Sequence, residues 1–248
     1  MPVLFRPLLL SLILAVGAGS ATAADMTDAE RKVFREEVRA YLIENPEVLV
    51  EALDVLRARD AQVEADRDAA LLVEYHDPLF NDAASWVGGN PEGDITIVEF
   101  VDYRCSYCRK AHSEVVELVK TDGKIRLIMK EYPILGEQSL SSSRFAIAVL
   151  QLHGPEAYEI AHDALITLRG DATPERLARL ASELGHDPGP ILSLMDTPEV
   201  TAVIQANHGL GEAMAINGTP TFVVGGTLLR GYAPLEAMRA IVADERKG

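Results

Sequence analysis

Cysteine is scarce in this chain, which has two among its 248 residues, at positions 105 and 108. Two cysteines are too few for the several disulfides that hold small secreted domains together. A chain of this length also buries enough apolar surface to form a core without covalent help. We therefore expect the pair to serve a chemical role and not a stabilising one.

Basic residues are in the minority as well, because 23 Lys and Arg stand against 38 Asp and Glu and give a formal net charge of −15. An acidic chain repels nucleic acid and anionic lipid, so neither is expected as a partner. The length and composition indicate one globular domain of ordinary size with an accessory segment.

Long apolar runs are missing, and the one candidate lies at the start of the chain. Residues 8–16 are apolar, follow Arg6 and precede the small residues Ala-Thr-Ala at 21–23. A membrane-spanning helix needs about 20 apolar residues, so this run is too short. A basic residue, a short apolar stretch and an A-x-A site are typical of a cleavable secretory signal. We expect residues 1–23 to be removed and the mature protein to be exported.

Residues 24–85 are expected to form a helical segment and a linker. Thr27 and Glu30 have the spacing of a capping box, and apolar residues then follow at helical spacing until Asn-Pro at 45–46 interrupts them. A second apolar stripe occupies residues 48–56. Such a stripe packs either against the rest of the chain or against another copy of it. We favour self-association, which makes the protein a homo-oligomer.

The rest of the chain, from residue 86 to 248, alternates strand and helix patterns. A β-favouring run, a helical stretch and a second strand follow one another and predict a right-handed βαβ unit. The order predicts an α/β fold, with helices on both faces of a mixed sheet. Residues 76–93 show no periodicity and are expected to be a turn-rich boundary. The predicted elements are strands at 94–103 and 124–132, a helix at 109–120, a helical insertion at about 137–214, a hairpin within 219–232 and a closing helix at 234–244.

The two cysteines follow directly after the first strand, in the stretch VEFVDYRCSYCRKAH (98–112). At the start of a helix, positions i and i+3 lie on one face, so the two sulfurs can bond to each other or face an incoming disulfide. Free backbone N–H groups and the positive end of the helix dipole stabilise a thiolate there. Arg104, Arg109 and Lys110 add positive charge nearby. We expect Cys105 to be the nucleophile.

Cys108 is one turn further into this helix and is expected to be the resolving thiol. Attack by Cys105 on a partner gives a mixed disulfide, which Cys108 then resolves. Ser106 and Tyr107 lie between the cysteines, where their N–H groups solvate the thiolate, and we assign both to substrate binding. Such a site needs no cofactor beyond its own Cys105–Cys108 disulfide and no metal.

Three other roles for the pair have their own requirements. Structural zinc takes four ligands, and there is one pair of cysteines, which His112 could extend to a two-sulfur, one-nitrogen site. A soft Cu(I) site made by the two thiolates is a further possibility. A purely structural disulfide would close so short a loop that it hardly restrains the unfolded chain. We favour the redox role.

Three features together resemble a known family. The stretch TIVEFVDYRCSYC (96–108), the later NGTPTFVV (217–224) and the secretory signal resemble the DsbA-like thiol:disulfide oxidoreductases of the thioredoxin superfamily. The resemblance covers about residue 86 to the end. The earlier YLIENPEVLVEAL (41–53) is similar to the helical oligomerisation segment of the ScsC-like branch, the copper-sensitivity suppressor proteins. The resemblance implies a thioredoxin fold with an inserted helical domain, preceded by an N-terminal helical segment.

The resemblance also implies roles for four further residues. Pro220 would be a cis-proline that faces the disulfide, and Thr219 would present backbone groups to a bound substrate strand. An X-Pro bond is the one place where the cis form costs little. Glu99 and Lys130 fall where the family has a charged pair beneath the active site, and the pair could help to move the proton of Cys108.

The family further implies a periplasmic enzyme that acts on exported polypeptides and exchanges electrons with a membrane partner of the DsbB or DsbD type. Ser-Tyr stands between the cysteines where the founding oxidase has Pro-His, so the direction stays open among oxidase, isomerase and reductase. An oligomer would favour isomerisation or reduction. The alternative function is copper tolerance through Cu(I) binding by the two thiolates.

Overall fold

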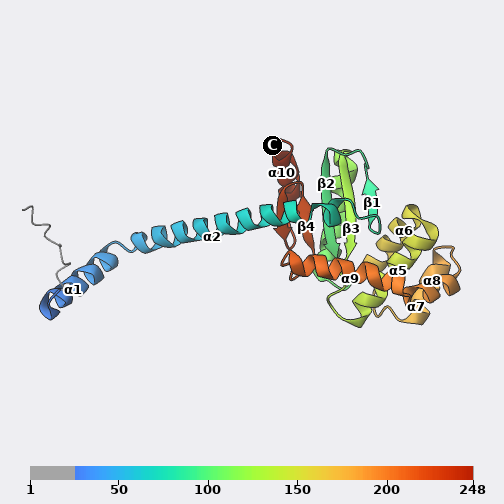
Figure 1. Cartoon of the computed structure of the whole chain (residues 1–248), viewed down its shortest axis with the longest axis horizontal. Coiled ribbons are helices and arrows are strands. Elements are labelled where there is room, and N and C mark those ends of the chain that lie inside the picture. Colours follow the sequence, from blue (N-terminus) through green and yellow to red (C-terminus); the bar gives the residue numbers. More distant parts are fainter. Residues whose placement is uncertain (1–25, 248) are drawn as a thin grey trace, which may run out of the picture. The chain divides into compact units, whose positions relative to one another are not determined.

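The computed structural model describes residues 26–247 (Figure 1). The predicted secretory signal at 1–23 lies outside the described residues. The chain divides into two compact units, one up to Arg59 and one from Asp60 onward. No helix in the described part is long and apolar enough to cross a membrane.

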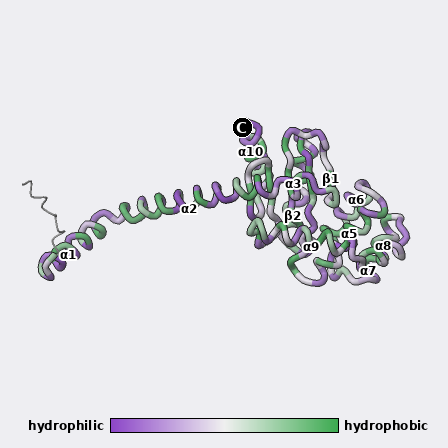
Figure 2. The backbone as a smooth tube through the Cα atoms, viewed as in Figure 1, coloured by the Kyte–Doolittle hydropathy of each residue, from purple (hydrophilic) through white to green (hydrophobic). Residues whose placement is uncertain are grey.

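The first unit consists of α1 (Asp28–Glu44) and the N-terminal part of α2 (Glu47–Glu74). The predicted capping box is confirmed, because the Glu30 N–H donates to the Thr27 hydroxyl (3.3 Å) and the Thr27 N–H donates to the Glu30 carboxylate (2.8 Å). α1 buries no side chain, and Figure 2 shows hydrophobic residues along both helices. The exposed apolar side chains are Val33, Phe34, Val38, Tyr41, Ile43, Leu49, Val50, Leu53, Val55 and Leu56.

The second unit is built on a five-stranded sheet with the order β1-β3-β2-β4-β5. β2 (Ile95–Val101) and β3 (Ile125–Glu131) are parallel and are joined by α4 (Ser106–Asp122), which confirms the predicted βαβ unit. β4 (Thr221–Val224) and β5 (Thr227–Arg230) form the predicted hairpin, and β4 pairs antiparallel with β2. The predicted mixed sheet is therefore present.

Two elements lie where the sequence predicts only a turn-rich boundary, so that prediction is wrong for both. α3 (His76–Phe80) follows α2, and β1 (Trp86–Gly89) pairs antiparallel with β3. Four residues that include two glycines carry no periodic signal, so the pattern cannot reveal β1. Trp86 holds the strand in place, because its indole N–H donates to the Pro155 carbonyl (2.9 Å) and its ring stacks on Tyr158.

Helices before and after the hairpin complete the second unit. The region predicted as a helical insertion consists of five helices between β3 and β4, and the closing helix follows β5. The C-terminal part of α2 and α3 also belong to this unit, so it begins earlier than residue 86. The helices are α5 (Glu137–His153), α6 (Pro155–Ile166), α7 (Pro174–Glu183), α8 (Pro188–Met195), α9 (Pro198–Ala213) and α10 (Leu235–Glu245).

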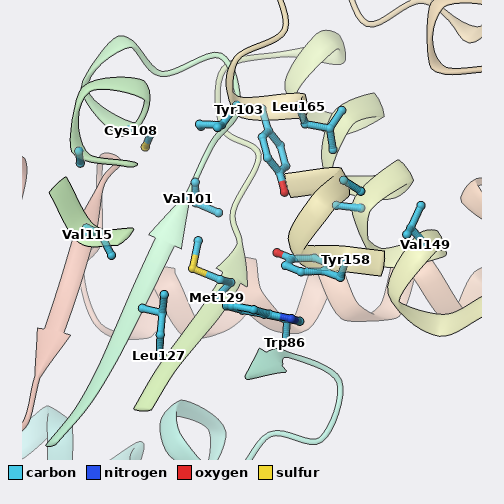
Figure 3. Close-up of a cluster of buried hydrophobic side chains, with 14 of the residues drawn as sticks. Trp86, Val101, Tyr103, Cys108, Val115, Leu127, Met129, Val149, Tyr158 and Leu165 are labelled. Atoms are coloured by element: carbon cyan, nitrogen blue, oxygen red, sulfur yellow. The ribbon is translucent and has the colours of Figure 1, made fainter. Parts of the chain in front are cut away.

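Both faces of the sheet are buried, and each faces a different core. Odd-numbered side chains of β2 and β3, such as Ile97 and Met129, pack with residues of α4, α5, α6 and α10 (Figure 3). Even-numbered side chains, such as Phe100 and Ile128, pack with residues of α2, α3 and α9. Successive residues of a strand point to opposite faces, so each position belongs to one core or the other.

Candidate active site

The loop between β2 and α4 carries the two cysteines, and a buried aspartate holds its shape. Asp102 Oδ1 accepts hydrogen bonds from the Arg104 N–H (2.7 Å) and the Ser139 hydroxyl (2.7 Å), and its Oδ2 accepts one from the Ile134 N–H (2.8 Å). The Cys105 N–H donates to the Asp102 carbonyl (3.1 Å). Asp102 therefore fixes the backbone that brings Cys105 to the start of α4. Nothing in the sequence pattern distinguished it from an ordinary turn residue.

Cys105 is the N-cap residue of α4, and Cys108 lies one turn further in. Both are free thiols, 8% and 0% exposed. The pKa of Cys105 is lowered to about 5, and the largest cause is a hydrogen bond from the Cys108 thiol. Burial acts in the opposite direction and raises the pKa. Hydrogen bonds from the Thr219 hydroxyl and from the N–H groups of Cys108 and Tyr107 lower it further. The same sulfur–sulfur contact, together with burial, raises the pKa of Cys108 far above its usual range. At neutral pH a thiolate at Cys105 therefore lies beside a neutral thiol at Cys108.

The loop before β4 meets Cys105 from the other side. The Thr219–Pro220 peptide bond is cis. In its neutral form the Cys105 thiol donates a hydrogen bond to the Thr219 carbonyl, with the sulfur 3.0 Å from that oxygen. The Thr219 hydroxyl is buried without another partner, so it is free to donate to the sulfur once that sulfur is charged. Thr219 therefore lies directly against the sulfur that is expected to react.

Glu99 is 3% exposed, and its carboxyl makes no side-chain hydrogen bond to any described residue. Burial raises its pKa to about 8, with smaller contributions from the negative charges of Cys105 and Glu131. The charge of Glu99 in turn raises the pKa of Cys108. Its carboxyl lines a cavity of about 460 Å³ between α4, α6 and the sheet. Glu99 is thus electrostatically coupled to both cysteines.

Lys130 does not pair with Glu99, so the predicted charged pair is wrong. In the parallel register Glu99 lies opposite Met129, and Phe100 lies opposite Lys130. Neighbouring positions of a strand point to opposite faces, so the two side chains lie in different cores. The Lys130 side chain is 1% exposed, and its ammonium donates to the Asp82 carboxylate at 2.6 Å. Asp82 follows α3, in the stretch whose structure the sequence pattern did not reveal.

A second buried carboxylate, that of Glu131, anchors a polar network that sequence reasoning missed. Its Oε1 accepts hydrogen bonds from the hydroxyls of Tyr103 (2.7 Å) and Tyr158 (2.6 Å), two rings that Figure 3 shows beside each other. His162 Nδ1 lies 2.9 Å from the Tyr103 oxygen, and since Tyr103 gives its proton to Glu131, the imidazole N–H is the donor. Burial raises the pKa of Glu131 to about 7 and lowers that of His162 to about 3.

The three basic residues near the cysteines have two different roles. Arg104 donates to the Gly170 carbonyl (2.7 Å) and Arg109 donates to the Leu168 carbonyl (3.0 Å), so both connect the redox loop to the helical insertion. Lys110 lies over an aromatic ring and keeps its charge on the exposed side of α4. Two of the three cations are thus structural contacts as well as local charges.

His112 does not complete a metal site with the cysteines. Its Nε2 lies 3.1 Å from Asp163 Oδ1, and its ring centroid lies 5.2 Å from that of His162. Within residues 26–247, no three His, Cys, Asp or Glu side chains are grouped so that they could hold a metal ion. The two-sulfur, one-nitrogen site that the sequence left open is therefore not formed.

Comparisons with known proteins match both parts of the chain. A family model described as Thioredoxin matches residues 81–244, and one described as Copper resistance protein ScsC N-terminal domain matches residues 30–62. The structure is similar to a thioredoxin-like oxidoreductase from Silicibacter pomeroyi DSS-3, with 42% identity, a TM-score of 0.65 and coverage of 69% of this chain and 98% of that one. It is also similar to Proteus mirabilis ScsC in a transitional conformation, with 27% identity, a TM-score of 0.65 and coverage of 90% and 98%.

Curated proteins match part of the chain. The thiol:disulfide interchange protein DsbA of Bordetella pertussis is 28% identical over 54% of this chain and 65% of its own length. The Na⁺/H⁺ antiporter NhaA 3 of Salinispora tropica is 26% identical over 63% of this chain, and the chain spans 24% of the length of that antiporter. The fold, the paired cysteines and these matches show that the chain belongs to the thioredoxin family and, within it, to the ScsC branch of the DsbA-like thiol:disulfide oxidoreductases.

Proposed function

We propose that this chain catalyses thiol–disulfide exchange on exported polypeptides in the periplasm. The observation that carries the proposal is the Cys105 thiolate, with a pKa near 5, beside a neutral Cys108 and against the backbone of Thr219. A thiolate is the form that attacks a disulfide, and a neutral thiol one turn away is held ready to resolve the product. The predicted secretory signal supports the compartment.

The proposed exchange has two steps. The Cys105 sulfur bonds to one sulfur of a substrate disulfide, and the other substrate sulfur leaves as a thiolate that takes a proton from water. Cys108 then gives its proton to a base and attacks Cys105, which forms the Cys105–Cys108 disulfide and releases the remaining substrate sulfur as a thiolate that takes a proton from water. The substrate gains two electrons and the chain loses two. The reverse sequence oxidises a substrate dithiol.

Glu99 is the proposed proton acceptor for Cys108. Lys130, which was expected to share this role, takes no part in the proposed step. The negative charge of Cys105 is one of the causes that hold the pKa of Glu99 up. Formation of the mixed disulfide removes that charge, so Glu99 ionises more readily at the step in which Cys108 must give up a proton. The coupling thus supplies a base when one is needed.

The substrate is proposed to lie along Thr219 and Pro220 and to reach Cys105 from there. Thr219 already contacts the Cys105 sulfur, and Ser106 and Tyr107 are exposed beside it. An extended polypeptide that forms main-chain hydrogen bonds with the segment before β4 would bring its own cysteine to the Cys105 sulfur. These four residues are therefore the proposed substrate contacts.

The redox proposal is tested by trapping. Cys108→Ser removes the resolving thiol, so the mixed disulfide through Cys105 should accumulate with unfolded exported proteins and disappear on reduction. The double variant with Cys105→Ser is the matched control, because it keeps the fold and lacks the nucleophile. If the single variant captures no more protein than the double variant, exchange is not the function of this site.

The first unit is proposed to join copies of the chain into a homo-oligomer. Its helices expose a row of apolar side chains, none of α1 is buried, and apolar stripes of this kind bury themselves against each other. An oligomer that holds several redox sites together is expected to work as an isomerase or reductase, kept reduced by a membrane partner of the DsbD type. A monomer is expected to work as an oxidase with a partner of the DsbB type.

Light scattering on the mature chain tests the oligomer. Phe34→Glu places a charge within the exposed apolar row of α1 and should lower the mass to that of a monomer. Arg35→Glu introduces the same side chain at the next position and should leave the oligomer intact. A mature chain that is monomeric without any substitution would contradict the proposal.

Copper handling is a second candidate function, and two observations favour it. The sulfurs of Cys105 and Cys108 lie close enough together to share one Cu(I), and residues 30–62 match the N-terminal domain of a copper resistance protein, ScsC. It predicts that the reduced chain binds one equivalent of Cu(I) and that either Cys→Ser change abolishes binding. Failure to compete with a Cu(I) chelator would exclude it without affecting the redox proposal.

A further inference from the structure

The loop between β5 and α10, residues 231–234, contacts both halves of the redox site. The Gly231 N–H donates to the Pro220 carbonyl (2.9 Å), next to the loop that touches Cys105. Gly231 has a φ of +100°, a backbone angle that favours glycine, so the chain turns sharply there. The residue after this turn, Tyr232, contacts α4.

Tyr232 makes three contacts along one face of α4. Its ring stacks on that of Tyr107, with centroids 6.1 Å apart and planes inclined by 28°. The Lys110 ammonium lies 4.2 Å from the centroid of the Tyr232 ring. The Tyr232 hydroxyl donates to Glu114 Oε1 (2.8 Å), and Glu114 Oε2 accepts from the Leu235 N–H (2.8 Å). The three partners are spaced by three and four residues, so they share one helix face.

These contacts bear on the reactive sulfur because Tyr107 and Lys110 lie in the first two turns of α4, the helix that Cys105 caps. The Tyr107 N–H is one of the groups that stabilise the Cys105 thiolate. Lys110 carries a positive charge in the second turn of the same helix. Tyr107 is 58% exposed, and its aromatic contact within the described residues is with Tyr232. An exposed ring and a long exposed cation have many conformations unless a neighbour restricts them.

We infer that Tyr232 is a positioning residue of the redox site: by holding Tyr107 and Lys110 against α4, it sets how strongly the start of the helix stabilises the Cys105 thiolate. The inference rests on the proposed function, since it concerns the reactivity of the same sulfur. Sequence reasoning did not find Tyr232, which lies 125 positions after Tyr107 in the chain.

The direction of the effect follows from the charge. Tyr232→Leu removes the stacking and cation–π contacts, so the thiolate is less stabilised and the pKa of Cys105 rises. The reduced form is then less stable relative to the disulfide, and the equilibrium with glutathione shifts toward the oxidised chain. Aromatic and cation–π pairs of this kind predict a change of about two- to tenfold in the equilibrium constant.

The experiment uses the mature chain and two readouts that a merely structural residue would not move. One is the pH dependence of thiolate absorbance at Cys105, and the other is the equilibrium constant with glutathione. Tyr232→Leu should shift both in the stated directions, and Tyr232→Phe, which keeps the ring, should shift them less. Tyr75→Leu is the control, because Tyr75 packs on the opposite core and should leave both unchanged.

A double-mutant cycle keeps the inference testable if Tyr232→Leu alters folding. Lys110→Gln changes an exposed side chain, and its effect is measured in the wild-type chain and in whichever of the Tyr232→Leu and Tyr232→Phe chains folds. The substitution should raise the pKa of Cys105 more in the wild-type chain than in the Tyr232 variant. If the wild-type chain equilibrates with glutathione and the Tyr232 variants match it in both readouts, the positioning role is refuted. If the wild-type chain does not exchange with glutathione, the proposed function itself fails.

Discussion

Glu99→Gln should stabilise the reduced protein by an amount that grows with pH. The folded chain holds Glu99 at a pKa of about 8, against an ordinary value of 4.5, because burial disfavours the carboxylate. Since the folded-state pKa is raised, the stability contributed by the neutral carboxyl is fully present below pH 4.5 and is lost as the pH rises through 8. Each pKa unit corresponds to about 1.4 kcal/mol. The loss is therefore about 3 kcal/mol at pH 7 and about 4 kcal/mol at pH 8.

Urea denaturation of the reduced chain measures this loss. The difference in unfolding free energy between Glu99→Gln and wild type should increase by about 3 kcal/mol from pH 5 to pH 8, whatever constant offset the amide introduces. Glu183→Gln, at an exposed carboxylate of α7, is the matched control and should show no such trend. A Glu99→Gln difference that does not vary with pH would refute the reasoning, because Glu99 would then titrate alike in the folded and unfolded chains.

Three further predictions concern the second unit. Asp82→Ala leaves Lys130 buried without its counter-ion and should lower the unfolding free energy, measured in urea, by about 3 kcal/mol. Adding Lys130→Met to the same chain should restore most of that loss. A negligible loss in Asp82→Ala would contradict a buried ion pair. Alkylation of Cys105 by iodoacetamide should follow a pKa near 5 and stay constant above neutral pH, and a midpoint at the ordinary thiol pKa would show that the thiolate is not stabilised. Gly211→Ala places a Cβ 2.5 Å from the Tyr132 ring and should lower the unfolding free energy in urea by about 1 to 3 kcal/mol, and unchanged stability would contradict the close packing of α9 on Tyr132.

Local pattern was sufficient for the elements that surround the cysteines. The βαβ unit, the hairpin and the capping box at Thr27 each depend on residues close together in the chain, and each is confirmed. The spacing of Cys105 and Cys108 likewise implies a shared helix face, because helix geometry fixes where positions i and i+3 lie. β1 was missed because a four-residue strand with two glycines exists only through its partner, β3.

The wrong prediction that Glu99 pairs with Lys130 shows what could not be predicted from the sequence. Both residues lie on the strands that flank the redox loop, but a shift of one position in the register of a strand moves its side chains to the opposite face. The register places Lys130 with Asp82 and leaves Glu99 alone near the cysteines. Register between parallel strands depends on how the whole sheet packs, and no local pattern carries it.

By itself the sequence determined the elements around the cysteines, the position of two thiols at a helix start and the family to which such a chain belongs. The tertiary structure decided which other groups act on those thiols. The neighbouring Cys108 lowers the pKa of Cys105 most, but Thr219 lowers it as well; the pKa of Glu99 depends on burial, and the α4 face beside the site depends on Tyr232. Thr219 and Tyr232 are far from the cysteines in the chain, and the free energy of a charge is set by whatever solvent, dipoles and charges surround it in the folded molecule.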